Sequence, residues 1–190
     1  MKTKMGIMVL AAAYILILLL MFILPLFSVP DYSIIRNTIG ELGAQSSPYA
    51  WVVNFTFVFL AIGSVIAGWA GFEGFTLHRI ILVLFGISLT LSAFFNHAPI
   101  NPDMRYNITE AGLNSYFACT AVFSFIILSI ATSFIMERQH ERLLALAAGS
   151  SAIVLSILAS ESEQMAGIWH RLLLIVSFGW MIYNFKIRDY

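Results

Sequence analysis

The sequence has few charged residues. Of its 190 residues only 11% are charged, 60% are hydrophobic, and the mean hydropathy is +0.89. A soluble domain carries roughly 25% charged residues, so this chain lacks the polar surface that a water-soluble globule needs. Its basic and acidic residues balance to a formal net charge of zero. The absence of a basic block excludes nucleic acid as a partner, and the composition is that of an integral membrane protein.

The chain also lacks residues on which several functions depend. Its single cysteine, Cys119, cannot form an internal disulfide and is interpreted as a small packing residue. No Asp, Glu, Lys or Arg stands in the middle of an apolar segment, which argues against proton pumps, ion-coupled carriers and voltage sensors. The sequence motifs of serine hydrolases, zinc peptidases and nucleotide-binding loops are missing.

Six apolar segments fill most of the sequence, each near the roughly 20 residues that cross a bilayer core. They are residues 5–27, 51–71, 77–95, 115–136, 143–159 and 167–185. The first is longer than the apolar part of a signal peptide and is followed by no A-x-A cleavage pattern, so we interpret it as a retained span. The sequence therefore predicts an all-α fold, a single six-span transmembrane domain over residues 1–190.

Basic residues in the loops predict the orientation. With the N-terminus inside, the cytoplasmic side holds seven of them and the outer side three. The cytoplasmic set is Lys2, Lys4, Arg79, Arg138, Arg142, Lys186 and Arg188, and the outer set is Arg36, Arg105 and Arg171. The positive-inside rule then predicts a multi-pass membrane protein with both termini in the cytoplasm. His78 and His140 fall on the cytoplasmic side and are interpreted as interfacial and solvated histidines.

The first outer loop contains the segment "PDYSIIRNTIGELG", which predicts a short amphipathic helix. Asp31 is expected to cap its start and Gly43 its end. Ile35, Ile39 and Leu42 share one helical face, and polar residues share the opposite face. The polar face includes Arg36, Asn37 and Glu41.

The second outer loop begins with "FFNHAPINPD", residues 94–103. Pro99 and Pro102 lack amide donors, so the helix is expected to stop and a non-helical flap to fold over the bundle. We expect the flap to present His97 and Asp103 inward, toward the first loop and His170. The polar neighbours of the flap are expected to be Arg36, Asn37, Glu41 and His170. Further along the chain, Asn107 is expected to cap the next helix, and the Glu110 side chain to reach back to Asn107.

Three stretches together resemble a known family. They are "YSIIRNTIGELGAQSSPYAWVVNFTFVF", "FFNHAPINPD" and "GIWHRLLLIVSFGWMIY". The sequence is similar to a bacterial family of small multi-span membrane proteins of unknown function, the domain-of-unknown-function family 998. The resemblance covers most of the chain. It implies a multi-span fold and a location in the bacterial inner membrane, but no reaction. In that family a histidine often stands near the position of Asn114, and its absence here counts against a histidine-cluster mechanism.

Polar residues of the outer loops form the candidate site, and three hypotheses compete for it. In the first, arginines bind an anionic lipid headgroup or other amphiphile at the outer leaflet. In the second, the chain is a structural or accessory subunit whose partner is another protein or a second copy. In the third, zinc held by His97, Asp103 and His170 supports an intramembrane lipid hydrolase. Whether the protein is an enzyme stays open. The candidate residues are Arg36, Asn37, Glu41, His97, Asp103, Arg105, Glu110, His170 and Arg171.

Overall fold

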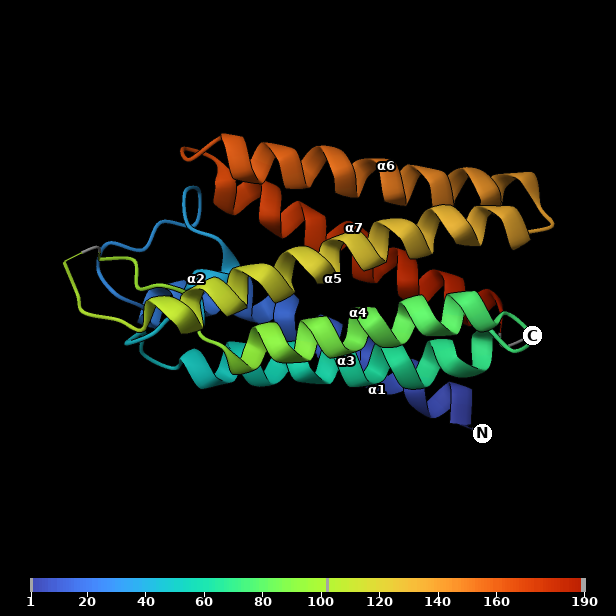
Figure 1. Cartoon of the computed structure of the whole chain (residues 1–190), viewed down its shortest axis with the longest axis horizontal. Coiled ribbons are helices and arrows are strands. Elements are labelled where there is room, and N and C mark those ends of the chain that lie inside the picture. Colours follow the sequence, from blue (N-terminus) through green and yellow to red (C-terminus); the bar gives the residue numbers. More distant parts are fainter. Residues whose placement is uncertain (1, 102, 189–190) are drawn as a thin grey trace.

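The computed structural model describes residues 2–101 and 103–188, and within them it contains helices and no strand (Figure 1). Six long helices are each apolar enough to cross a membrane, which confirms the predicted fold class. The helices in chain order are α1 (Lys2–Ile23), the 3₁₀ turn η1 (Leu24–Phe27), α2 (Ile39–Leu42), α3 (Ala50–Gly71), α4 (Thr76–Phe94), α5 (Ile108–Ile135), α6 (Gln139–Glu161) and α7 (Ala166–Ile187).

Local sequence explains where several helices begin and end. Pro25 follows the last turn of α1 and stands inside the 3₁₀ turn, where its missing amide donor costs least. Helix α5 begins seven residues before the predicted span because the Asn107 side chain caps it, accepting from the Glu110 amide at 3.2 Å. Gly74, with φ at +83°, makes the sharp turn between α3 and α4.

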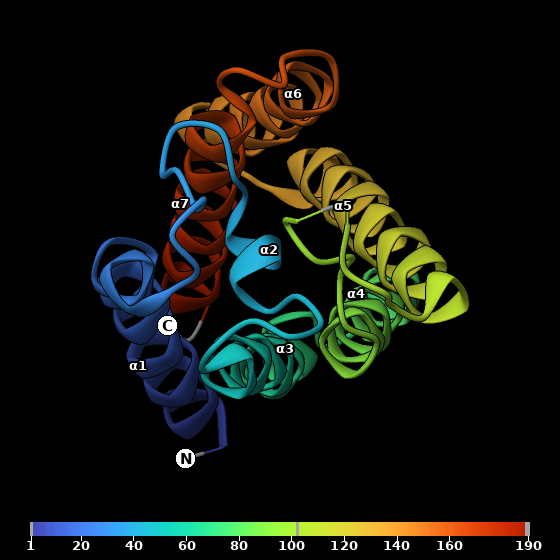
Figure 2. The same ribbon diagram turned by 90° about the vertical axis from the view of Figure 1, so that its left-hand side faces the viewer.

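The six long helices form a ring in which each packs against two neighbours. Around the ring the order is α1, α3, α4, α5, α6 and α7, with α7 returning to α1 (Figure 2). The ring closes where the Tyr14 hydroxyl of α1 donates to the Ile175 carbonyl of α7 at 3.0 Å. Helix α2 lies inside the ring at one end, where it contacts α3 and α7. The short helix therefore covers the bundle rather than lying outside it.

Glycines bring α1 and α3 into close backbone contact. A Cβ atom at Gly63 would lie 2.7 Å from the Leu10 amide nitrogen, and one at Gly6 would lie 2.5 Å from the Ala67 nitrogen. Distances this short admit no side chain, so both positions require glycine. Small residues at helix interfaces are the usual means of close packing in membranes, where helices gain nothing from leaving water.

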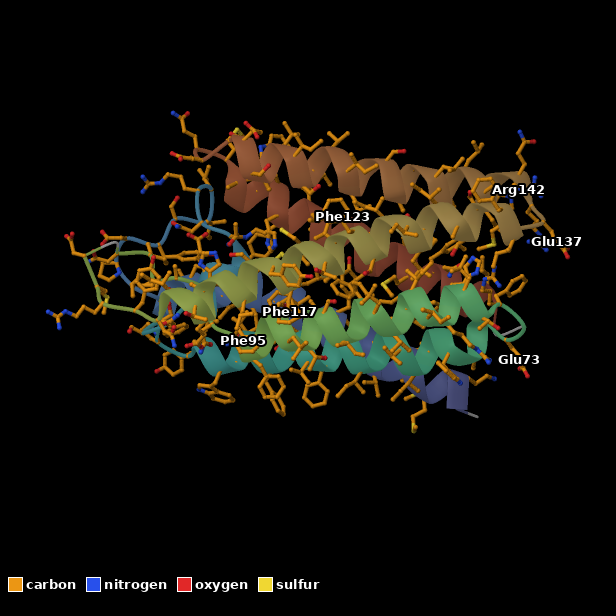
Figure 3. The ribbon with its side chains drawn as sticks, in the orientation of Figure 1. Glu73, Phe95, Phe117, Phe123, Glu137 and Arg142 are labelled. Carbon is orange, nitrogen blue, oxygen red and sulfur yellow. The ribbon has the colours of Figure 1, made fainter. Side chains whose placement is uncertain are left out.

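Aromatic side chains fill the middle of the ring, and large apolar side chains also cover its outside. Phe85 of α4 packs on Phe178 of α7 at 6.1 Å, and Phe125 of α5 packs edge-on against Trp180 of α7 at 5.7 Å. Outward-facing Phe134 is 78% exposed, which suits a lipid-facing surface and no aqueous one. Glu73, Glu137 and Arg142 lie at the end of the bundle away from α2 (Figure 3).

At that opposite end, His78 is buried rather than interfacial as expected. Its ring packs against Phe72 at 5.1 Å and Phe75 at 5.6 Å and is only 6% exposed. The Arg188 guanidinium lies over the same two phenylalanine rings and donates to the Gly71 carbonyl at 3.4 Å. Burial lowers the pKa of Arg188. Arg188, directly after α7, therefore holds the end of α3 and its connection to α4 in place.

The helix predicted in the first outer loop is confirmed, but it is much shorter than expected. Its cap is Thr38, not Asp31, and only Ile39–Leu42 is helical. Gly43 ends it as predicted, and Ile39 and Leu42 are buried. Ile35 lies outside the helix and is 53% exposed, so the prediction that it shares one helical face with Ile39 and Leu42 is wrong.

Candidate functional site

The polar candidates lie at the end of the bundle that holds α2. This end consists of α2 and the connecting segments 28–38, 43–49, 95–101, 103–107 and 162–165, which we call the rim. Three separate stretches of sequence meet there (Figures 1 and 2). Two sets of hydrogen bonds fix them: one joins the first loop to α7, and the other joins the first loop to the flap, residues 95–101 and 103–107.

Arg171 of α7 fixes the first loop. Arg171 is 4% exposed, and among the described residues its guanidinium donates to neutral acceptors only. It bonds to the Ile34 carbonyl at 2.7 Å, the Asn37 carbonyl at 3.0 Å and the Tyr32 hydroxyl oxygen at 2.7 Å. Its own helix supplies the Gly167 carbonyl at 2.8 Å. Backbone carbonyls and a hydroxyl group, and not a carboxylate, therefore hold this cation among the described residues.

Gly167 makes the approach of the loop to α7 possible. Its amide donates to the Arg36 carbonyl at 3.1 Å. A Cβ atom at this position would collide with the carbonyl oxygens of Ile34 and Asn37. Gly167 and Arg171, one helical turn apart, thus form a socket for the turn of residues 34–37. Burial in this socket raises the pKa of Tyr32, and the nearby Arg171 charge opposes the rise only in part.

Glu41 is held firmly at the start of α2. Its carboxylate accepts from the Asn37 side-chain amide at 2.9 Å and from the Thr38 backbone amide, and its own amide donates to the Thr38 hydroxyl at 3.3 Å. This is a capping box, for which the "TIGE" sequence is the signature. Asn37 is itself fixed, because its Oδ1 accepts from the Ser33 amide at 2.9 Å.

Amide side chains hold the flap to the first loop. The backbone amide of Gln45 donates to the His97 carbonyl at 2.9 Å. The Gln45 side chain donates to the Asn107 carbonyl and accepts from the Asn107 backbone amide. Asn54 of α3 donates to the Asn96 side chain at 2.7 Å. We call Gln45, Asn54, Asn96 and Glu110 the clasp.

Glu110 is the charged member of the clasp. Its Oε1 accepts from the Asn96 backbone amide at 2.9 Å and from the Asn96 side chain at 2.8 Å. The prediction that Glu110 reaches back to Asn107 is therefore wrong, although Asn107 caps α5 as expected. The flap is non-helical from Phe95 on, as predicted; Pro102 lies outside the described residues. Among the described residues the flap is bonded by the clasp and by Asn114, which donates to the Phe95 carbonyl at 2.8 Å. The expected neighbours Arg36, Asn37, Glu41 and His170 form no hydrogen bond with it there.

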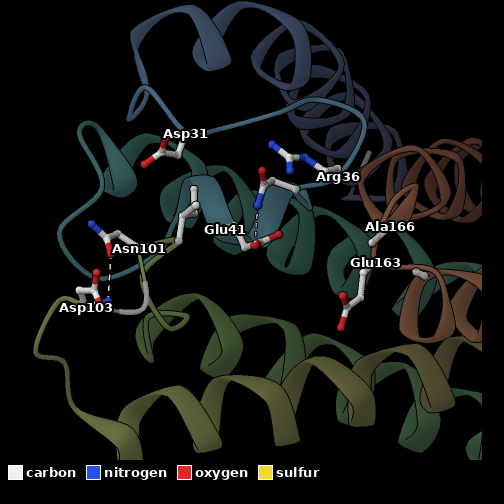
Figure 4. A pocket seen from close by; sticks show the side chains of 10 residues that line it. Asp31, Arg36, Glu41, Asn101, Asp103, Glu163 and Ala166 are labelled. Carbon is white, nitrogen blue, oxygen red and sulfur yellow. Dashed lines mark hydrogen bonds between the residues drawn. The ribbon is translucent and has the colours of Figure 1, made fainter.

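An open cavity of about 780 Å³ lies between the first loop, the flap and the α6–α7 turn. Asp31, Asn101 and Asp103 stand on one side, Glu163 and Ala166 on the other, and Arg36 and Glu41 between them (Figure 4). No carboxylate among the described residues lies within ion-pair distance of Arg36. Most of the charged side chains that line the cavity are therefore acidic. The lining residues are Asp31, Arg36, Asn37, Glu41, Ile100, Asn101, Asp103, Ala159, Glu163 and Ala166.

The structure brings some of the predicted site residues together and separates others. Arg36, Asn37, Glu41 and Asp103 line this cavity. Arg105 is exposed and does not line it. Glu110 and Arg171 are engaged in the clasp and the socket. The three outer arginines therefore do not converge on one ligand position.

No hydrogen bond joins His97 to His170 among the described residues. Both His97 and Glu41 are within electrostatic reach of the His170 ring, whose Nδ1 is buried and has no partner among those residues. The His97 ring lies 2.9 Å from the Ala98 carbonyl. Within residues 2–101 and 103–188, no three His, Cys, Asp or Glu side chains are grouped as metal ligands.

Several residues of the rim are not among the candidate site residues predicted from the sequence. Asp31 and Glu163 line the cavity, Gly167 forms the socket, and Gln45 and Asn96 form the clasp. The capping-box pattern of residues 38–41 was a signal that could have placed Glu41 correctly. No local pattern identifies the others, since their roles depend on contacts between distant segments.

The fold and the rim define a class: an all-helical, multi-span membrane protein with a polar cavity at one end of its bundle. A family model described as "Protein of unknown function (DUF998)" matches residues 9–183. The chain therefore belongs to the DUF998 family, as its resemblance to that family implied. No curated protein and no solved structure matches the chain.

Proposed function

We propose that this protein binds the polar head of a lipid or another amphiphile in the rim cavity, at the outer leaflet of the bacterial inner membrane. The observation that carries the proposal is the cavity itself. Its volume of about 780 Å³ falls within the roughly 300–1,000 Å³ of small-molecule sites. The socket and the clasp hold its walls in place, so a ligand need not order them on binding.

The position of the cavity suits an amphiphile. Its lining includes Ala159 near the end of α6, and the preceding turns of α6 expose Ile153, Val154 and Ile157. Helices α5 and α6 meet at the end away from the rim and diverge toward it (Figures 1 and 2). A polar head in the cavity would therefore have apolar side chains next to it, where an acyl chain can run into the bilayer.

A blocking substitution tests the proposal. Ala159→Trp places a large ring in the cavity wall, whereas Ser160→Trp places the same ring one residue away, at an exposed position outside the lining. The full chain is purified in mild detergent from a bacterial membrane, and the retained lipid is quantified by mass spectrometry. We expect Ala159→Trp to reduce retained lipid about tenfold, a change of 1.4 kcal/mol, and Ser160→Trp to leave it unchanged.

Two results would overturn the proposal. If both tryptophan variants retain as much lipid as the wild type, the cavity is not the binding site. If both lose lipid equally, the loss reflects disturbance of α6 and not occupation of the cavity. In either case the alternative of an accessory subunit, recognised by a protein partner, would take its place.

A further inference from the structure

The charges of the cavity lining restrict the ligand that it can accept. Four carboxylates line it, from Asp31, Glu41, Asp103 and Glu163, together with one guanidinium, from Arg36. Their formal charges sum to −3, and two side-chain amides complete the polar lining. A ligand with a net negative charge would face four like charges and find one opposite charge.

The single cation of the cavity stays unpaired in spite of its acidic surroundings. Arg36 is exposed and forms no ion pair among the described residues. The Asn37 amide and the Thr38 backbone amide hold the Glu41 carboxylate, so Glu41 is not free to swing toward Arg36. The guanidinium and the carboxylates are therefore separated from each other around the cavity, and a ligand that carries both a positive and a negative charge fits between them.

We infer that the ligand of this cavity has a head with a positively charged nitrogen beside a phosphate, as in an amine-bearing zwitterionic phospholipid. This inference rests on the proposed function and names its ligand class. The phosphate binds the Arg36 guanidinium, which offers paired donors to phosphate oxygens. The ammonium group lies among the carboxylates that line the cavity, of which Asp103 and Glu163 stand on opposite sides (Figure 4). Anionic phospholipids lack the ammonium and bind more weakly.

A comparison of two lipids with identical acyl chains tests the inference. The full chain in detergent, stripped of lipid, is titrated with dioleoyl-phosphatidylethanolamine or dioleoyl-phosphatidylglycerol, and bound lipid is counted by native mass spectrometry. The wild type is expected to prefer the ethanolamine lipid by about tenfold. The double variant Asp103→Asn/Glu163→Gln is expected to lose that preference. Glu161→Gln is the matched control, because Glu161 is exposed at the end of α6 and lies outside the lining.

A third arm separates a membrane lipid from a free head of the same chemistry. O-Phosphoethanolamine carries the same two charges without acyl chains. If it binds the wild type and not the double variant, the ligand is the soluble head. If only the dioleoyl lipid binds in this way, the ligand is the lipid. Either result supports a zwitterionic amine head.

The outcomes separate this inference from the proposed function. Equal binding of both lipids, abolished by Ala159→Trp, would overturn the zwitterionic assignment and leave the cavity as a lipid site. A preference for phosphatidylglycerol would overturn it as well, and so would equal loss of preference in Glu161→Gln. Binding of both lipids that Ala159→Trp does not change would overturn the proposed function itself.

Discussion

Two residues of α7 determine how the first loop sits on the bundle. Arg171 gathers the carbonyls of Ile34 and Asn37, and Gly167 lets their backbone come close enough for this to happen. A buried arginine without a carboxylate partner is tolerable here because its donors are distributed over five neutral oxygen atoms. The pair therefore acts as one unit, and damage to either should release the same loop.

Gly167→Ala tests the socket. The new methyl group would collide with the carbonyls of Ile34 and Asn37, and relieving such overpacking typically costs about 1–3 kcal/mol. We expect the midpoint of thermal unfolding in detergent to fall accordingly. Gly112→Ala is the control, because nothing lies within 4 Å of a Cβ atom there, and alanine favours the helix by about 1 kcal/mol. Equal midpoints for the two variants would contradict the socket.

Tyr32 gives the socket a dependence on alkaline pH. Burial raises the pKa of Tyr32 in the folded chain, whereas an unfolded tyrosine ionises near pH 10. The neutral hydroxyl therefore contributes its stability in full below about pH 10 and loses it as the pH rises further. In pH-dependent unfolding, Tyr32→Phe is expected to fall less steeply than the wild type above about pH 10. Parallel curves over that interval would show that Tyr32 is not buried in the socket.

Residue roles could be predicted from the sequence only where they depend on neighbours in the chain. Asn107 was recognised as a cap because its partner stands three residues on. Arg171 could be predicted as a candidate site residue, but its hydrogen-bond acceptors could not. The true acceptors are about 135 residues away in sequence, and carbonyl groups leave no mark in a sequence.

At the scale of elements, hydropathy predicts the long helices, but it does not predict the extent of the short helix α2. Runs of apolar residues fix a transmembrane helix because unpaired backbone groups are costly in lipid. The segment 31–37 has the helical pattern but remains a set of turns. Arg171 and Tyr32 donate to the Asn37 carbonyl, and the Asn37 side-chain oxygen accepts from the Ser33 amide. These tertiary bonds replace the ones that a longer helix would have made.

The flap is an element whose order depends on the clasp. Glu110→Ala removes the acceptor of two Asn96 donors, and hydrogen bonds to charged groups contribute about 1.5–3 kcal/mol each. We expect faster hydrogen exchange at the amides of residues 96–101 and 103–107, with exchange in residues 81–89 of α4 unchanged. Glu161→Ala is the control, since this carboxylate is exposed at the end of α6. Unchanged exchange in the flap of Glu110→Ala would show that the clasp does not hold it.

At the scale of the whole molecule, the exposed aromatic residues of α3 mark a bilayer. Trp51 is 70% exposed near the rim, and Trp69 is 49% exposed at the other end. At about 1.5 Å per residue their spacing along the helix is about 27 Å, close to the roughly 30 Å of a hydrocarbon core. Tryptophan favours the two interfaces of a membrane. The rim cavity therefore lies at one membrane surface, a placement that no single segment of the sequence reveals.

The orientation of the molecule decides which surface that is. Seven basic residues stand at the end opposite the rim against three at the rim, so the positive-inside rule predicts that the rim faces outward. Two cysteine variants can report this: Gln139→Cys at the start of α6 and Gln164→Cys in the turn between α6 and α7, both at exposed positions. Each is placed in a Cys119→Ser background, because Cys119 is itself exposed. An impermeant maleimide added to intact cells is expected to label Gln164→Cys at once, and Gln139→Cys only after the membrane is permeabilised. The reverse pattern would place the cavity, and the lipid head that we assign to it, at the cytoplasmic leaflet.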